Sequence, residues 1–505
     1  MTEFVVEKHL NFAPRMALAA LGGALGALAH APFDWSVLIL VPLVTGFFMV
    51  QHTNNRVGAF FTGWAIGVGY FALTLRWIVE PFQVDATVHG WMAPFALFFL
   101  AAGLALFWGL AFLLAFRRGA IALAAFWTLV ELGRAYLFTG FPWGNFAQAL
   151  LDTPFQSLLS IIGPHGLTLA LLLFVALLFG GWARACLGIG LCVGLGTTLY
   201  LSPKPPLQMT DKTVRIVQPN APQHEKWHPE KGPEFVRRQL SYTEAPGQVD
   251  LVLWPETAIP YLFSNAEIIF EFAAQSADGA PVVMGVQRDD DQGRYFNSAV
   301  LLDEVGAVRQ IYDKHHLVPF GEYMPFPELF RSLGIAAIAE RSDGGYTPGP
   351  GPQIMELGDL GSALPLICYE AVFPQDLRGT NRPDFLMQLT NDAWFGVDAG
   401  PEQHLAQARM RSIEQGLPMA RAANTGISAM IGPYGQVLDS LPLDEAGFVD
   451  ALLPMPLPAT IYSRTGDAPA NGVIILMSGL ILLRHMRAKR REGDSPRSVR
   501  GLVTS

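Results

Sequence analysis

Charged residues are scarce in this chain of 505 residues. Only 15% of them are charged, whereas about a quarter are charged in an average soluble domain. The shortage lies in the first two hundred residues and in one stretch near the end of the chain. The net charge of −9 argues against a nucleic-acid-binding protein, which normally presents a basic face. We therefore expect a membrane protein with a water-soluble insert and no nucleic-acid partner.

Cysteine is also rare and occurs three times, as Cys186, Cys192 and Cys368. The first two share one apolar run and are interpreted as packing residues. Cys368 stands alone in the more polar part of the chain. That part therefore forms no internal disulfide.

Long apolar runs, by contrast, are abundant. A helix needs about 20 apolar residues to cross a bilayer, and eight runs approach this length. They lie at about 14–32, 35–51, 57–79, 90–115, 120–139, 161–181, 183–202 and 468–484. The first run leads directly into the second, so it is not interpreted as a cleavable signal peptide. We predict a multi-pass α-helical membrane domain with eight spans.

Lys and Arg residues indicate the orientation of these spans. If eight spans are counted, the basic residues near their ends all fall on one side, which the positive-inside rule makes cytoplasmic. The prediction is a membrane domain at 1–204, an outer domain at 205–465, and a final span with a basic cytoplasmic tail at 466–505. The basic residues are Lys8, Arg15, Arg56, Arg117, Arg118, Arg184, Arg484, Arg487, Lys489, Arg490 and Arg491.

Two pairs of opposite charges lie near the outer ends of predicted spans. Arg76 and Glu80 are four residues apart, and Glu131 and Arg134 are three apart. Ionisable groups at membrane depth often mark function. Mutually paired anchors at the membrane surface would give the same pattern, and both interpretations stay open.

The segment between the seventh and eighth runs alternates strands and helices. Helical stretches at about 230–244, 264–276 and 402–416 lie among short apolar strands, which predicts an α/β domain with a largely buried sheet. The strand-like runs are 214–218, 251–254, 281–285, 298–302, 363–367, 385–389 and 427–431.

Reactive side chains occur in three short segments where apolar strands end. These segments contain Glu256, Lys314 and Cys368. Taken singly, each has an ordinary interpretation: a turn glutamate, a solvated loop lysine and a small core cysteine. Together they offer a base, a cation and a nucleophile. A thiol with an ordinary pKa of about 8.5 becomes reactive when a nearby cation or base favours the thiolate.

These segments resemble the Glu-Lys-Cys signatures of the nitrilase (carbon–nitrogen hydrolase) superfamily. With the membrane spans included, nearly the whole chain resembles its membrane-bound branch, the apolipoprotein N-acyltransferase family. The likeness extends to motifs at 217–220, 295–297, 390–396, 404–411 and 421–426. It implies that the α/β domain is a nitrilase-like α-β-β-α sandwich.

The resemblance also implies a role for each matching residue. Cys368 would be the nucleophile and Glu256 the general base. Lys314 would stabilise the oxyanion together with the backbone N–H of Tyr369. Glu322 would be a second carboxylate that orients Lys314 or relays protons. The supporting residues implied around them are Tyr369, Glu370, Trp227 and Asn297.

The family's reaction has two steps. An acyl chain passes from the sn-1 position of phosphatidylethanolamine to Cys368 as a thioester, and then to the α-amino group of a diacylglyceryl-cysteine. The implied partners are a phospholipid donor, apolipoproteins and the bacterial inner membrane, with residues 205–465 in the periplasm. We expect no cofactor and no metal, because adjacent His315 and His316 lack the spacing of a metal-binding pair.

The segment at 324–338 has little charge and contains Phe326 and Phe330. It is either an ordinary core helix or a mobile arm that dips into the outer leaflet and gates lipid entry. In the second case, Trp143 in an outer loop would face it across the lipid entrance.

Two other functions fit parts of the sequence. A membrane-tethered nitrilase or amidase that hydrolyses a small amide would use the same three residues, although a single span would suffice as its tether. A transporter or receptor with a non-catalytic outer domain predicts the loss of Glu256, Lys314 or Cys368. All three residues are present.

Overall fold

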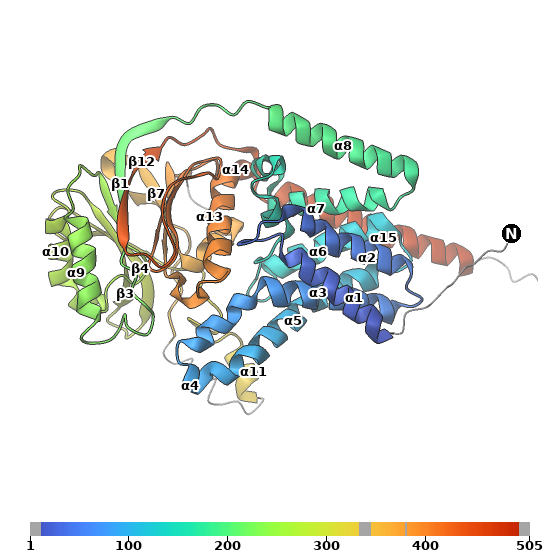
Figure 1. The fold of residues 1–505 in the computed structure, drawn as a ribbon, viewed down its shortest axis with the longest axis horizontal. Helices are drawn as coiled ribbons and strands as arrows, with labels where there is room; N and C mark the ends of the chain where they lie inside the picture. Colours follow the sequence, from blue (N-terminus) through green and yellow to red (C-terminus); the bar gives the residue numbers. More distant parts are fainter. Residues whose placement is uncertain (1–11, 333–344, 379–380, 494–505) are drawn as a thin grey trace, which may run out of the picture.

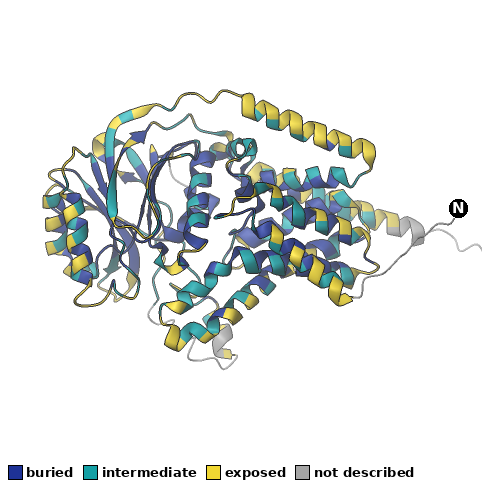
Figure 2. Ribbon diagram, in the orientation of Figure 1, coloured by how far each residue is buried: buried dark blue, intermediate teal, exposed yellow. Residues whose placement is uncertain are grey.

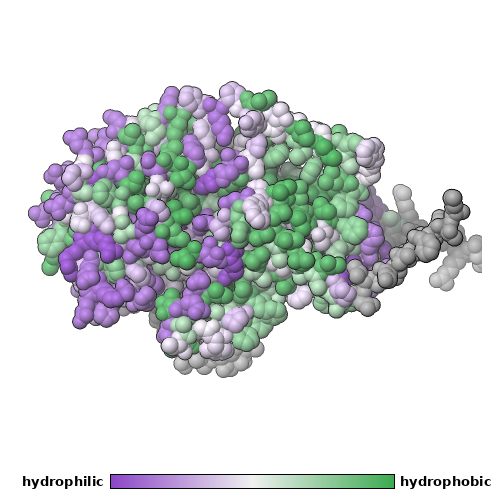
Figure 3. All heavy atoms as spheres, viewed as in Figure 1, coloured by the Kyte–Doolittle hydropathy of each residue, from purple (hydrophilic) through white to green (hydrophobic). Residues whose placement is uncertain are grey.

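Two parts of different chemistry lie side by side in the computed structural model, which describes residues 12–332, 345–378 and 381–493 (Figure 1). One part is a bundle of apolar helices, and the other is an α/β domain. Hydrophobic residues cover much of the visible bundle surface, whereas polar residues dominate that of the α/β domain (Figure 3). The surfaces differ as expected for a protein that is partly in lipid and partly in water.

The helical part comes mainly from the N-terminal two fifths of the chain. A final helix returns to it after the α/β domain and packs on α6 and α7. The helices are α1 (Phe12–Ala27), α2 (Leu40–Gln51), α3 (Arg56–Thr74), α4 (Ala86–His89), α5 (Ala93–Ala115), α6 (Ala120–Tyr136), α7 (Leu159–Leu178), α8 (Trp182–Leu201) and α15 (Ala468–Gly493).

Five helical segments within the described part of the chain are long and apolar enough to cross a membrane. They are Arg56–Thr74, Ala86–Ala115, Pro154–Leu178, Trp182–Leu201 and Ala468–Ala488. Two further apolar helical segments, Phe12–Ala27 and Ser36–Gln51, are shorter. The run predicted at 120–139 forms α6, which has 17 residues. Several apolar helices are thus confirmed, and the number of eight spans stays a prediction.

Two six-stranded sheets form the centre of the α/β domain. The first has the order β12-β1-β2-β3-β4-β5 and the second β11-β10-β9-β8-β7-β6. The strands of the first sheet are β1 (Met209–Gln218), β2 (Leu251–Leu253), β3 (Val282–Asp289), β4 (Tyr295–Leu302), β5 (Val308–Asp313) and β12 (Gly447–Pro454). Those of the second are β6 (Met355–Glu356), β7 (Ser362–Ile367), β8 (Phe385–Thr390), β9 (Met419–Ala423), β10 (Ser428–Ile431) and β11 (Val437–Leu441).

Helices cover the outer faces of the two sheets. On the first sheet, Val252 and Met284 pack in one cluster with Phe270 of α10 (Glu267–Ser276), beside α9 (Gly232–Thr243). On the second, Leu366 packs with Ala408 of α13 (Gly400–Gln415). Central strands such as β2 and β8 are buried along their whole length, which explains their unbroken apolar sequence. The predicted α/β domain is confirmed.

All seven strand-like runs form strands, and the three helical stretches become α9, α10 and α13. Five strands were not predicted: β5, β6, β9, β11 and β12. β6 has two residues, and β5 and β11 alternate between exposed and half-buried positions. Such strands are paired by their neighbours and carry a weak local signal.

The bundle and the α/β domain share a buried polar contact centred on Gln403 of α13. Its Oε1 accepts a hydrogen bond from Trp143 Nε1 at 2.7 Å, and its Nε2 donates to the carbonyls of Ala31 and Thr74 at 3.1 Å each. At the edge of this contact, Arg76 pairs with Asp398 of the α/β domain, its Nη2 lying 2.9 Å from Oδ1. Arg76 begins a 3-10 helix, η2 (Arg76–Gln83). A pair between residues four apart assumes an α-helix, whereas in a 3-10 helix residues three apart lie on the same side.

Candidate active site

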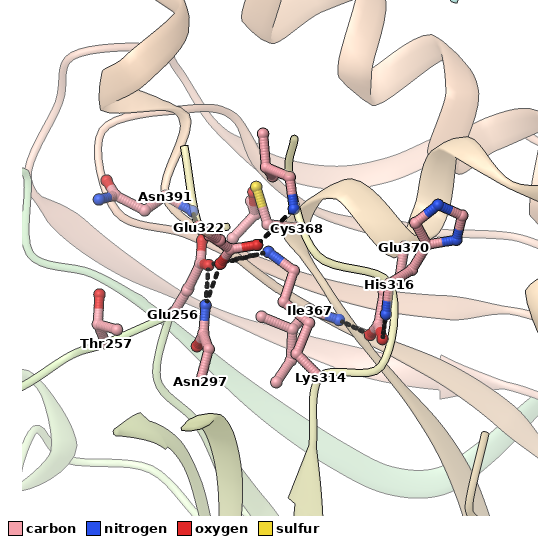
Figure 4. Close-up of polar contacts among 12 residues, drawn as sticks. Glu256, Thr257, Asn297, Lys314, His316, Glu322, Ile367, Cys368, Glu370 and Asn391 are labelled. Atoms are coloured by element: carbon pink, nitrogen blue, oxygen red, sulfur yellow. Dashed lines mark hydrogen bonds and ion pairs between the residues drawn. The ribbon is translucent and has the colours of Figure 1, made fainter. Parts of the chain in front are cut away.

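The three predicted catalytic residues lie at the ends of three strands and converge on one buried site (Figure 4). Glu256 follows β2, Lys314 follows β5 and Cys368 follows β7. Lys314 Nζ lies 3.7 Å from Glu256 Oε1. The three residues are between 1% and 6% exposed. A base, a cation and a thiol therefore share one dry environment.

Lys314 has a closer partner in Glu322. Its Nζ donates to Glu322 Oε1 at 2.9 Å, and the other oxygen of that carboxylate accepts the backbone N–H of Val318 at 2.7 Å. The amide of Asn297 donates to both carboxylates, to Glu256 Oε1 at 2.7 Å and to Glu322 Oε1 at 3.0 Å. These bonds leave the ammonium and both carboxylates in fixed positions.

Glu256 lies on a turn that is pressed against a neighbouring strand. Its second oxygen accepts the backbone N–H of Asn391 at 2.8 Å. The turn bonds to Gly285 of β3 on both sides, and a Cβ at Gly285 would lie 2.6 Å from the Cα of Glu256. The next residue, Thr257, has a φ of 42°, a region that non-glycine residues rarely adopt. The position of the carboxylate therefore depends on close backbone packing.

Cys368 occupies a sharp turn between β7 and the 3-10 helix η9 (Cys368–Val372). Its φ is 50°, a strained conformation that surrounding bonds must hold in place. Glu370 supplies such bonds. Its carboxylate accepts the N–H of Ile367 at 2.7 Å, the N–H of His315 at 2.8 Å and the hydroxyl of Tyr312 at 2.9 Å. One buried carboxylate thus ties the nucleophile turn to the loop that follows Lys314.

A second polar network lies behind the nucleophile. Gln388 Nε2 donates to the carbonyl of Cys368 at 3.2 Å and lies 3.1 Å from His404 Nε2. His404 Nδ1 faces Asp392 at 2.9 Å, and Arg421 binds the same carboxylate at 2.6 Å. Gln388, His404, Asp392 and Arg421 are all fully buried. They hold the carbonyl of the nucleophile from the side of the second sheet.

Burial sets the resting protonation of the site. It raises the pKa of the Cys368 thiol well above its usual range, with the Glu256 carboxylate acting in the same direction and Lys314 against it. Burial alone would lower the pKa of Lys314, but the carboxylates of Glu322 and Glu256 outweigh it and raise that pKa. At neutral pH the cysteine is therefore a thiol and the lysine an ammonium, and attack by sulfur requires a base.

The other predicted residues have different surroundings. Asn297 and Glu370 belong to the buried networks, and Tyr369 is buried against the rings of His316 and Phe373. Trp227 is 43% exposed. Their roles stay predictions.

The residues predicted at the lipid entrance, Trp143, Phe326 and Phe330, do not share one environment. Phe326 is exposed, whereas Trp143 is fully buried in the contact between bundle and α/β domain. Phe330 lies in α11 (Pro327–Ser332), but its side chain and residues 333–338 of the predicted arm lie outside the described residues. The structure therefore places Trp143 away from a surface entrance, and the role of Phe326 stays a prediction.

A cleft of about 500 Å³ lies beside the catalytic loops. Tyr295, Tyr323 and Tyr346 contribute to its lining. The backbone N–H of Tyr346 donates to the carbonyl of Glu322 at 2.8 Å. The cleft therefore adjoins the backbone of the loop that carries Glu322.

Among the residues that the structure describes, no group of three or more His, Cys, Asp and Glu side chains could hold a metal ion. The adjacent His315 and His316 bind carboxylates instead. His315 Nδ1 lies 2.7 Å from Glu370, and His316 Nδ1 lies 2.7 Å from Asp376.

Two residues that touch Glu256 were not identified from the sequence. Asn391 directly follows β8, the same kind of position that revealed Cys368, and this signal could have found it. Lys226 is buried, and its Nζ donates to the carbonyl of Glu256 at 3.1 Å. It lies on a polar loop where local sequence carries no comparable signal.

The arrangement can perform nucleophilic acyl chemistry. In such chemistry Glu256 would take a proton, Cys368 would attack a carbonyl, and Lys314 would stabilise the negative charge that develops on its oxygen. This chemistry is common to hydrolysis and to acyl transfer. The acceptor decides between them.

Comparisons with known proteins cover both parts of the chain. A model described as carbon-nitrogen hydrolase matches residues 213–458, and one described as apolipoprotein N-acyltransferase N-terminal domain matches residues 22–177. The apolipoprotein N-acyltransferase of Rhodopseudomonas palustris is 37% identical over 93% of this chain and 95% of its own length. That of Caulobacter vibrioides is 36% identical over 95% of this chain and 96% of its own. A carbon–nitrogen hydrolase structure from Helicobacter pylori covers 48% of this chain and 88% of its own, at 17% identity and a TM-score of 0.37.

Proposed function

Because the chain belongs to the apolipoprotein N-acyltransferase family, we propose that it transfers a fatty acyl chain from a phospholipid to the N-terminal α-amino group of diacylglyceryl-modified apolipoproteins. This is an enzymatic step of lipoprotein maturation. The convergence of Cys368, Glu256 and Lys314 in one buried site, next to a bundle of apolar helices, is the observation that carries the proposal.

The first half-reaction forms a thioester. Glu256 takes the thiol proton, and the sulfur of Cys368 attacks the sn-1 ester carbonyl of phosphatidylethanolamine. Lys314 and the backbone N–H of Tyr369 stabilise the resulting oxyanion. When the intermediate collapses, the glycerol oxygen leaves with the proton held by Glu256. The products are an S-acyl cysteine and a lysophospholipid.

The second half-reaction forms an amide. The free α-amine of the apolipoprotein attacks the thioester carbonyl and passes a proton to Glu256. The tetrahedral intermediate expels the sulfur, which regains that proton as a thiol. Water must be kept out of the site so that the amine, and not water, attacks the thioester. Burial of all three catalytic residues favours this outcome.

Both proposed substrates carry membrane-anchored acyl chains, which gives the helical bundle a purpose beyond anchoring. The proposal places residues 1–204 and 466–505 in the bacterial inner membrane and its cytoplasmic edge, with residues 205–465 in the periplasm. The one-sided distribution of Lys and Arg supports this orientation. Contacts between Arg15 and the carbonyl of Met49 place the start of α1 and the end of α2 at the same edge of the bundle.

The orientation can be tested by labelling from outside spheroplasts. In a chain without Cys186 and Cys192, a new cysteine at Val305 should react with a membrane-impermeant maleimide, and one at Arg117 should not. Val305 is 73% exposed on the α/β domain. Efficient labelling at 117 from outside would overturn the topology.

The reaction is tested on the purified full-length chain in two stages. Phosphatidylethanolamine labelled in its sn-1 chain should first leave an acyl group on the Cys368 peptide, cleaved by neutral hydroxylamine and detected by mass spectrometry. A diacylglyceryl lipopeptide added next should gain one acyl chain as an amide. Release of free fatty acid in place of the amide would instead indicate a hydrolase.

Single substitutions separate the assigned roles. Cys368→Ala should abolish labelling, whereas Cys186→Ala and Cys192→Ala serve as matched controls and should not. Glu256→Gln should slow thioester formation by about 100-fold or more, because an amide cannot accept the thiol proton. Acyl transfer by Cys368→Ala at a normal rate would refute the covalent mechanism.

A further inference from the structure

The catalytic site contains more negative than positive charge if only Glu256, Glu322 and Lys314 are counted. Glu256 and Glu322 are two carboxylates, and both approach the single ammonium of Lys314 at 3.7 and 2.9 Å. Asp392 nearby is matched separately by Arg421. A buried charge without a counter-charge is costly. A second cation near Glu256 would remove this imbalance.

Lys226 is such a cation. It is 3% exposed, and its Nζ donates to the carbonyl of Glu256 at 3.1 Å and to the hydroxyl of Thr257 at 2.8 Å. One acceptor of Lys226 belongs to Glu256 and the other to Thr257, the next residue, whose backbone is strained. Figure 4 shows the Thr257 side chain beside Glu256. Lys226 thus holds the turn that carries the base.

The surroundings of Lys226 point to Glu256 as its charged partner. Burial lowers the pKa of Lys226 to about 8, and the Glu256 carboxylate opposes this effect. The titratable neighbours on its own loop are His224, Glu225 and His228. Glu225 pairs at the surface with Lys231. The loop is therefore not organised to neutralise Lys226 by itself.

The same loop reaches Glu256 by a second route. Gln223 Oε1 accepts a hydrogen bond from Asn391 Nδ2 at 2.8 Å, and the backbone N–H of Asn391 donates to Glu256 Oε2. Two residues of this loop therefore connect to the base: Lys226 to its backbone, and Gln223, through Asn391, to its carboxylate.

We infer that Lys226 is a positioning residue for the general base, which holds the Glu256 turn and supplies the second positive charge of the site. This rests on the proposed role of Glu256. A cation here favours the ionised form of the acidic groups around it, and its bond to the Glu256 carbonyl keeps the base in place. Without this cation, the turn loses both bonds and Glu256 is less well placed to accept the proton of Cys368.

The test uses alkylation of Cys368 by iodoacetamide in the purified full-length chain, followed by mass spectrometry of its peptide between pH 5 and 9. This readout needs no phospholipid, so it is independent of whether acyl transfer occurs. Lys226→Met should slow alkylation at pH 7 by about 10- to 100-fold. It should also move the acid limb of the profile to higher pH, because a nearby cation favours the ionised form of acidic groups.

Two further variants separate charge from packing. Lys226→Arg keeps the charge and should leave the acid limb at its wild-type position, even if the rate falls. Lys231→Met removes an exposed lysine near the same loop and should match the wild type. A wild-type rate and profile in Lys226→Met would overturn the proposal. An equal shift of the acid limb in the Met and Arg variants would overturn the role of the charge.

Thermal unfolding in detergent checks that each variant is folded. If both Lys226 variants fail to fold, Thr257→Val tests the same contact with the lysine in place. It should slow alkylation and leave the acid limb unmoved, because it removes one acceptor and no charge. A wild-type rate in this variant would show that the contact does not position the base.

Discussion

Glu322 holds the ammonium of Lys314 more closely than Glu256 does, at 2.9 Å compared with 3.7 Å. The two carboxylates therefore have different surroundings, although both approach the same cation. The carboxylate oxygens of Glu322 accept hydrogen bonds from Lys314, Asn297 and the backbone N–H of Val318. Glu256 is bound by the amide of Asn297 and the backbone N–H of Asn391. We therefore expect Glu322 to orient the lysine and Glu256 to move the proton.

Replacing Glu322 by Gln should slow thioester formation by about 100-fold. A glutamine amide cannot satisfy both sides of this site. Its NH₂ group would face either Lys314 and Asn297, which are donors, or the N–H of Val318. Acylation of Cys368 by labelled phospholipid measures the effect. Glu304→Gln, an exposed position in the same domain, should retain the wild-type rate, and a normal rate in Glu322→Gln would remove this carboxylate from the mechanism.

If Phe326 contacts the outer leaflet as predicted, Phe326→Asp should reduce acylation from phospholipid by about tenfold, because a charge there opposes contact with the bilayer. Alkylation of Cys368 by iodoacetamide should be unchanged, since a small reagent needs no lipid contact. Phe326 is 53% exposed, and Val305→Asp provides a control at another exposed apolar side chain. Equal loss in both assays would indicate damage to the fold and contradict a role in lipid entry.

Arg134→Met should destabilise the protein by about 3–5 kcal/mol, because it leaves a buried carboxylate unpaired. Arg134 binds Glu131 at 2.7 Å and the carbonyl of Trp143 at 2.8 Å, and both charged side chains are almost fully buried. The comparison is Arg76→Met. Asp398, its partner, has 54% of its side chain exposed, and that pair should contribute about 0–1 kcal/mol. Thermal unfolding in detergent should rank the two variants in this order.

His315 should make stability depend on pH. Burial would lower its pKa, but the hydrogen bonds to Asp376 and Glu370 raise it to about 10, from an ordinary value of 6.5. A group whose pKa is higher in the folded than in the unfolded state stabilises the fold fully at pH values below its unfolded-state pKa. This stabilisation is lost as the pH rises towards its folded-state pKa. The Tm difference between wild type and His315→Gln should therefore be largest near pH 6 and shrink by pH 10. A difference that grows with pH would contradict the assigned charge.

The local sequence determined the features that depend on run length and periodicity. The five longest apolar helices, the seven predicted strands and the positions of Glu256 and Cys368 after strands follow from neighbouring residues, whereas β5, the strand before Lys314, was not predicted. Burial over a whole strand or span leaves a continuous apolar signal that can be recognised without a structure.

The tertiary structure decided which distant groups meet. Asn391 reaches Glu256 across 135 residues of sequence, and Arg76 reaches Asp398 across 322. Trp143 packs against Phe395 of the α/β domain, and Gln403 from α13 accepts its buried N–H. Lys226 lies against the base because a polar loop folds over it. Such contacts satisfy charge and hydrogen bonding between segments that are remote in the chain. No local pattern encodes their partners, since each side chain alone is equally compatible with solvent.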